Sequence, residues 1–216
     1  MKHRICFIDD DAAFEIPLFE QVFGDRYDIV SETSFEAAVK AMEKRGAWKP
    51  ELFVLDLYFP TGHPDQDEIK ALTGKLLVFE DDHAQLRASY TNYVRAESRL
   101  IAVLSAWRQG AQGGLALAQR VIADFPGVPI LFYSRKANFE DAVRCMALPG
   151  VHGVQKKPTG NDDEETRRIT MARQEHLVRR FDGLLTQSRS DDSHTVNDAS
   201  ELVWKIIRPM LYDEDR

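Results

Sequence analysis

The stretch ICFIDDDAAF, residues 5–14, runs from a short apolar segment into three consecutive aspartates at positions 9–11. Its apolar residues predict a buried strand over residues 4–8. Bringing carboxylates together is costly unless water solvates them or a cation lies among them. Two interpretations therefore remain open for the aspartates. They form a solvated turn that caps a helix N-terminus, or they bind a hard cation such as Mg²⁺ or Ca²⁺.

Strand-like and helical patterns alternate along much of the chain. Further strands are predicted over residues 27–33, 51–57, 128–133 and 152–155, and helices over residues 14–22, 35–42, 115–122 and 139–146. The first of these strands is half polar, which suits a place at or near a sheet edge. The alternation predicts an α/β fold, a doubly wound parallel sheet with helices on both faces. In such sheets, sites form beyond the carboxyl ends of the strands.

Two segments depart from this alternation. Residues 61–112 are mostly helical in pattern and contain a long apolar stripe, which packs within its own domain or binds a partner. A further helical pattern ends at residue 185, residues 186–198 are a polar linker, and residues 199–216 are an amphipathic helix. We therefore predict a domain over residues 1–185 with a helical insertion, followed by a linker and a C-terminal helix.

Composition excludes several classes of function. The net charge of −7 argues against a DNA-binding surface, because phosphate contacts need a basic face. Two cysteines make no disulfide framework, which favours a reducing, cytoplasmic setting. No signal peptide and no apolar run of membrane-spanning length is present, so no membrane association is expected. The scattered histidines argue against zinc.

Three more side chains that can bind ions or react lie at predicted strand ends. Asp56 lies in VLDLYFP, Ser134 ends ILFYS, and Lys157 lies in GVQKKP. Taken singly, each could be an ordinary strand-end or loop residue. Parallel strands present their carboxyl ends at one edge, so together they bring carboxylates, a hydroxyl and an ammonium to the same place as the aspartates.

This ordered set of motifs resembles the receiver domains of response regulators in two-component signalling. The resemblance covers residues 2–60 and 113–185, and it rests on FIDDD, DLYFP, YS and KP. It implies a flavodoxin-like, five-stranded sheet with strand order 2-1-3-4-5. It also implies a phosphoacceptor, with autophosphatase activity at most, that is not a turnover enzyme. The implied partners are a histidine kinase or phosphotransfer protein, and a downstream target reached by protein contact.

The resemblance assigns roles to the site residues. Asp56 is the nucleophile that becomes an acyl phosphate, and phosphoryl transfer depends mainly on positioning and charge neutralisation. Mg²⁺ is the implied cofactor, held by Asp10, Asp56 and the Tyr58 backbone carbonyl, with Asp9 acting through water. Asp11 instead caps the first helix.

The remaining family motifs concern the phosphoryl oxygens. Lys157 pairs with one of these oxygens as a point charge. Ser134 donates its hydroxyl to another. The resemblance also implies a cis peptide bond before Pro158 that aims the lysine.

Several residues depart from the family pattern. Arg135 stands where receivers usually carry Ala or Gly, and it either crowds or clamps the phosphate. Val154 replaces the usual aromatic switch residue, which puts the usual switch coupling in doubt. Tyr58 and Lys136 occupy positions that tune attack of water, and Tyr58 shielding of the acyl phosphate is a hypothesis.

Other functions remain as alternatives. A degenerate, non-cycling receiver would act as an adaptor or scaffold. A Mg²⁺-dependent phosphohydrolase would need a second aspartate two residues after the nucleophile, but Tyr58 stands there. A homodimer through the insertion or the final helix is a further prediction.

Overall fold

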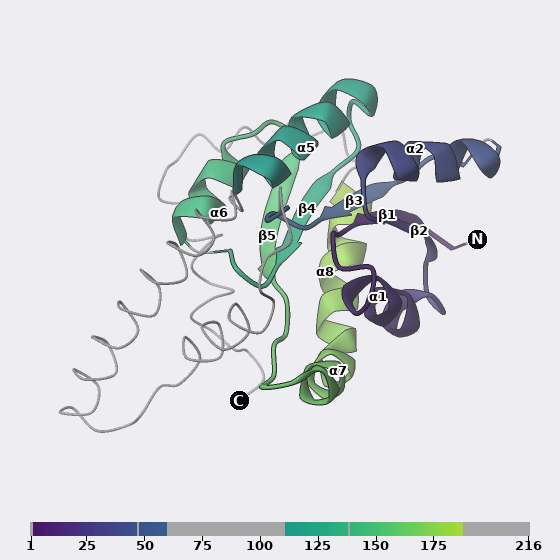
Figure 1. The fold of residues 1–216 in the computed structure, drawn as a ribbon. Coiled ribbons are helices and arrows are strands. Elements are labelled where there is room, and N and C mark those ends of the chain that lie inside the picture. The colour runs from purple at the N-terminus through teal and green to yellow at the C-terminus, as the bar shows by residue number, and fades with distance from the viewer. Residues whose placement is uncertain (1, 47, 60–110, 138, 188–216) are drawn as a thin grey trace.

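The computed structural model describes residues 2–46, 48–59, 111–137 and 139–187. The strands are β1 (Arg4–Ile8), β2 (Asp28–Glu32), β3 (Leu52–Leu55), β4 (Ile130–Ser134) and β5 (Val151–Lys156). The helices are α1 (Glu15–Phe23), α2 (Phe35–Lys44), α5 (Ala111–Asp124), α6 (Phe139–Met146), α7 (Asp163–Ala172) and α8 (Gln174–Gln187). All five predicted strands are present, with small shifts of their ends. They form one parallel sheet in the order β2-β1-β3-β4-β5, as predicted (Figure 1).

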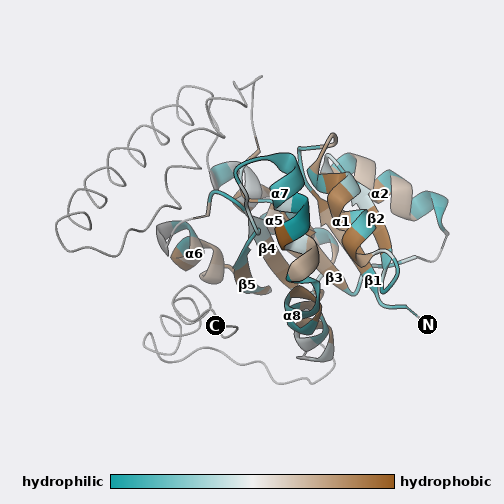
Figure 2. Ribbon diagram, turned by 90° about the horizontal axis from the view of Figure 1, so that it is seen from below, coloured by the Kyte–Doolittle hydropathy of each residue, from teal (hydrophilic) through white to brown (hydrophobic). Residues whose placement is uncertain are grey.

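The sheet lies between two layers of helices. Helices α2, α5 and α6 cover one face, and α1 and α8 cover the other (Figure 1). β1 serves both layers, because Cys6 and Ile8 belong to the first core and Ile5 and Phe7 to the second. Figure 2 shows hydrophobic residues gathered on the central strands and on the helix sides that face them. The apolar runs in the sequence are therefore strands buried on both faces, as is usual for parallel sheets.

Predicted helix starts are partly confirmed. Ser34 is the N-cap of α2, and its side chain accepts a hydrogen bond from Ala37 N at 3.2 Å. Asp11 Oδ1 accepts from Ala13 N at 3.1 Å and Phe14 N at 2.9 Å. These bonds close the turn before α1, three residues ahead of its N-cap Phe14, so the prediction that Asp11 caps the helix is wrong.

The single helical pattern predicted before residue 185 is wrong, because two helices occupy that region. α7 ends at Ala172, its C-cap Arg173 has φ −96° and ψ 6°, and α8 begins at Gln174. Thr166 and Thr170 are the buried residues of α7, whereas the predicted face residues Ala172 and His176 are exposed. The threonines can be buried because their hydroxyls bond within the segment: Gly160 N donates to Thr166 Oγ1 and Thr170 Oγ1 donates to Thr166 O.

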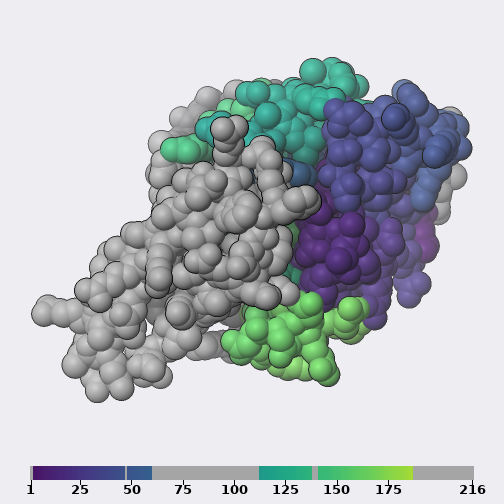
Figure 3. Space-filling view, in the orientation of Figure 1, coloured from purple at the N-terminus to yellow at the C-terminus, as the bar shows by residue number. Residues whose placement is uncertain are grey.

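The two C-terminal helices pack on the α1 side of the sheet. Figure 3 shows α7 in green beside the purple N-terminal residues, and α7 contacts α1. On α8, the buried apolar residues are Leu177, Val178, Phe181, Leu184 and Leu185. These residues complete the second core, so α8 is part of the folded domain.

The predicted insertion, linker and final helix lie outside the described residues, except at their edges. Residues 111–112 begin α5 and residues 186–187 end α8. Among the described helices, none combines the length and apolar character needed to cross a membrane. Cys6 and Cys145 are both buried and free.

Helix α5 meets the chain again just after β3. Gly114 N donates to Leu57 O at 3.0 Å, and a Cβ on Gly114 would lie 2.5 Å from that oxygen. A glycine is needed here because any side chain would push α5 away from the segment that follows Asp56.

We predict that Gly114→Ala lowers the free energy of unfolding by about 1–3 kcal/mol, since the clash is with backbone that cannot rotate away. Gly183→Ala is the matched control. A Cβ on Gly183, inside α8, meets nothing within 4 Å, so we expect a gain of about 0.4–1 kcal/mol. Urea unfolding of the two variants measures both values, and effects of the same sign would contradict the packing argument.

Candidate functional site

Lys157 lies at the centre of a buried charge cluster at the carboxyl edge of the sheet. Its ammonium pairs with Asp9 Oδ2. It lies 3.4 Å from Glu15 Oε2 and 3.5 Å from Asp56 Oδ1. Burial by itself lowers the pKa of Lys157, but the three carboxylates outweigh it and hold the pKa well above its usual range. The lysine is therefore charged, and it links the ends of β1, β3 and β5.

The two predicted acidic residues after β1 lie in this cluster. Burial raises the pKa of Asp9 to about 7, with Lys157 opposing and Asp56 adding to the rise. Burial and the Asp56 charge raise the pKa of Asp10 to about 6. Asp9 Oδ1 also accepts from Asp11 N at 3.0 Å. The carboxylates thus repel one another, and a cation among them would be stabilised.

Asp56 follows β3 and lies beside the end of β1. Its backbone N donates to Ile8 O at 2.9 Å, and its Oδ2 accepts from Tyr58 N at 2.9 Å. Only 6% of Asp56 is exposed. One carboxylate oxygen is thus held by the backbone, and the other faces the Lys157 ammonium.

Ser134 ends β4 and is buried. Its backbone oxygen accepts from Lys157 N at 3.2 Å, so the two residues lie on neighbouring strand ends. Among the described residues, its hydroxyl oxygen has no hydrogen-bond partner. A buried hydroxyl without a partner costs about 1–3 kcal/mol, and it would be satisfied by a ligand oxygen.

Sequence reasoning missed Glu15, which is buried at the first turn of α1. Its carboxylate pairs with Arg135 through Oε1 and faces Lys157 through Oε2. The guanidinium of Arg135 also lies 5.3 Å from the Phe14 ring centroid. An acidic residue in a first helical turn is usual, so no pattern in the sequence distinguishes this one.

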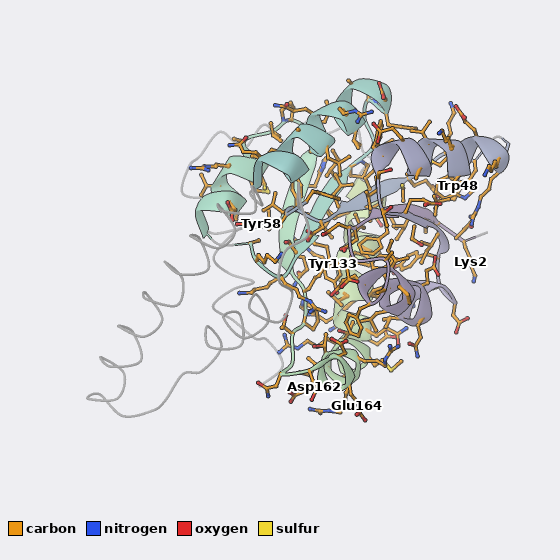
Figure 4. The ribbon with its side chains drawn as sticks, viewed as in Figure 1. Lys2, Trp48, Tyr58, Tyr133, Asp162 and Glu164 are labelled. Atoms are coloured by element: carbon orange, nitrogen blue, oxygen red, sulfur yellow. The ribbon has the colours of Figure 1, made fainter. Side chains whose placement is uncertain are left out.

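Tyr58 links the segment after β3 to α6. Its hydroxyl donates to Asp141, and burial holds the pKa of Tyr58 above its usual range. The Lys136 ammonium lies 5.9 Å from the Tyr58 ring centroid. Figure 4 shows Tyr58 beside α6 and Tyr133 at the centre of the molecule. Shielding of the phosphoryl group by Tyr58 stays a prediction.

Val154 on β5 and the peptide bond before Pro158 were both expected to matter for the site. Val154 is partly buried and packs against the first core, so an aliphatic side chain fills the position of the expected aromatic switch. The predicted cis bond before Pro158 is wrong, since no cis peptide bond occurs in the described chain. The trans form is the favoured isomer, and Lys157 is aimed by its ion pairs with the carboxylates instead.

The Mg²⁺ prediction can be compared with the donor set. Asp9, Asp10 and Asp56 supply the hard oxygen ligands that Mg²⁺ prefers, and their mutual repulsion favours a cation. Within the described residues, no group of three or more His, Cys, Asp or Glu side chains is already arranged to hold a metal. Here Lys157 neutralises part of the carboxylate charge. The chemistry of the residues fits the ion, and binding stays a prediction.

No protein-family model and no curated protein matches the sequence. Solved structures with a similar fold include several receiver domains. A CheY-like receiver domain protein from Methanospirillum hungatei is 12% identical with a TM-score of 0.47, covering 88% of this chain and 99% of that one. The non-phosphorylated HemR receiver domain from Leptospira biflexa is 16% identical with a TM-score of 0.45, covering 86% and 95%. The receiver domain of a putative LuxO repressor from Vibrio parahaemolyticus is 14% identical with a TM-score of 0.47, covering 89% and 96%. At these identities the similarity concerns the fold alone.

Proposed function

We propose that this chain is a receiver of two-component signalling that accepts a phosphoryl group on Asp56. One observation carries the proposal. The buried carboxylate of Asp56 lies 3.5 Å from the buried ammonium of Lys157, and at the next strand end the buried hydroxyl of Ser134 has no hydrogen-bond partner within the described part of the chain. A nucleophile, a cation and a donor hydroxyl are what transfer of a phosphoryl group requires.

The transfer follows from these roles. A carboxylate oxygen of Asp56 attacks the phosphorus of a phosphohistidine or of a small acyl phosphate. A P–O bond forms while the donor's P–N or P–O bond breaks, and the leaving group keeps the electron pair. Lys157 binds one phosphoryl oxygen, and Ser134 donates its hydroxyl to another. Water later attacks the phosphorus, releases inorganic phosphate and restores Asp56.

Mg²⁺ would be held by Asp10, Asp56 and the Tyr58 carbonyl, with Asp9 acting through water. When bound, it would neutralise charge on the carboxylates and on the phosphoryl oxygens. The raised pKa values of Asp9 and Asp10 support this role, because crowded carboxylates favour a cation.

The signal would pass by protein contacts in the cytoplasm. The donor would be a histidine kinase or a phosphotransfer protein, and a downstream protein would recognise the phosphorylated form. The hydrogen bond from Tyr58 to Asp141 supports transmission of the signal from the site to the surface, because it joins the segment after Asp56 to α6 on the domain surface. DNA is not expected as a ligand, in view of the net charge of −7.

Intact mass measurement after incubation with Mg²⁺ and acetyl phosphate tests the proposal. We expect the wild type to gain one phosphoryl group and Asp56→Ala to gain none. Asp124→Asn is the matched control, because this exposed aspartate ends α5, which leads to the amino end of β4 and not to the carboxyl edge where the cluster lies, so the gain should stay intact. No gain in the wild type would favour a non-cycling adaptor. Release of phosphate from small esters would instead favour a phosphohydrolase.

A further inference from the structure

Two cations of the cluster share one internal anion. The Glu15 carboxylate pairs with Arg135 through one oxygen and lies 3.4 Å from the Lys157 ammonium through the other. Only 9% of the Glu15 side chain and 19% of the Arg135 side chain are exposed. Glu15 therefore bridges the cations, as a tetrahedral oxyanion with several oxygens would.

Arg135 is placed to take part in binding such an anion. It directly follows Ser134, whose hydroxyl has no partner among the described residues. The Arg135 Nε is buried and has no hydrogen-bond partner within that part of the chain, while its Nη2 is the atom that pairs with Glu15 Oε1. The ring of Phe14 lies beside the guanidinium and limits the directions in which it can turn. A planar guanidinium with several donors suits phosphoryl oxygens better than an ammonium does.

The charge balance favours an exchange of anions. Asp9, Asp10, Glu15 and Asp56 outnumber the three nearby cations of the described chain, which are Lys157, Arg135 and Lys136. A phosphoryl group on Asp56 adds further negative charge, so it competes with Glu15 for Lys157 and Arg135. Glu15 lies in the first turn of α1, where the helix N-terminus stabilises a carboxylate that turns toward water.

We propose that Glu15 is an internal competitor of the phosphoryl group, and that Arg135 is an additional phosphoryl-binding residue. In the unphosphorylated protein, Glu15 occupies Arg135 and Lys157. On phosphorylation of Asp56 both cations turn to the phosphoryl oxygens, and Glu15 is released toward solvent. This inference rests on the proposed function, since it concerns the same phosphoryl group.

The rate of phosphorylation by acetyl phosphate, followed by intact mass at fixed Mg²⁺, tests the exchange. We expect Glu15→Gln to raise the rate about tenfold and Arg135→Ala to lower it about tenfold, because local charge attracts or repels an anionic donor. Arg135→Lys should recover part of the loss. In Glu15→Gln/Arg135→Ala the gain from Glu15→Gln should shrink, because one of the two released cations is missing.

The opposite directions of the two rate changes separate a role in phosphoryl binding from a purely structural role of the ion pair. A pair that only stabilises the fold would make both single variants worse, and rates that fall together would overturn the inference. So would rates equal to the wild-type rate. Glu36→Gln and Arg120→Ala, from an exposed ion pair on the α2 side, are the matched controls and should change nothing. Urea unfolding confirms that each variant is folded.

The experiment distinguishes the two proposals. If the wild type gains a phosphoryl group and Asp56→Ala does not, the proposed function stands whatever Glu15 and Arg135 do. If the wild type gains none, both proposals fail together.

Discussion

Lys157→Met is expected to lower the free energy of unfolding by about 3 kcal/mol, because it leaves buried carboxylates without their cation. The loss lies at the lower end of the usual range, since Asp9 already has a raised pKa and can take up a proton. Phosphorylation by acetyl phosphate should also slow by about 10²–10³, the usual effect of removing one preorganised charge-stabilising group. Urea unfolding and intact mass measure the two effects.

Lys156→Met is the control for this prediction. Lys156 is the last residue of β5 and directly precedes Lys157. Because the Lys156 side chain is exposed, the substitution should change the free energy of unfolding by less than about 0.5 kcal/mol. Equal effects of the two substitutions would mean that the charge cluster does not hold the strand ends together.

Phe181→Ala is expected to lower the free energy of unfolding by about 3–5 kcal/mol. Phe181 is fully buried on α8 and meets several rings. Its ring centroid lies 5.1 Å from that of Phe23, 6.0 Å from those of Phe19 and Tyr27, and 6.5 Å from that of Tyr133. The substitution removes these contacts and leaves a cavity between α8 and the sheet. A domain of ordinary stability, about 5–15 kcal/mol, would lose a large part of its margin.

Thermal and urea unfolding measure this loss. Arg179→Ala, at an exposed position on the same helix, controls for changes in helix propensity and should have little effect. If Phe181→Ala unfolds like the wild type, α8 is an appendage and does not contribute to the core.

The sheet could be predicted from the sequence because its strands are buried on both faces. Apolar runs such as residues 4–8 and 130–134 then stand out from amphipathic helices. Asp9, Asp56 and Lys157 were predictable for the same reason. Each directly follows a recognisable strand or ends it, and parallel strands bring these ends together.

Contacts between side chains of different elements could not be predicted in this way. Glu15 and Arg135 each have an ordinary local pattern, and only the approach of α1 to the end of β4 makes them a pair. The division between α7 and α8 was missed because buried threonines replace the expected apolar residues on α7. The cis bond was expected from the family motif alone, and no described peptide bond is cis.

The hydrogen bond from Gly114 N to Leu57 O also bears on how such a protein can change over evolutionary time. It fixes the point where the chain leaves β3 next to the point where α5 begins. Lengthening a loop whose ends are already joined costs only about 0.6 kcal/mol for each doubling of its length. The β3–α5 crossover is therefore a place where whole modules can be exchanged while the sheet stays intact. The joined residue Leu57 directly follows Asp56, so any module inserted there is attached close to the charge cluster.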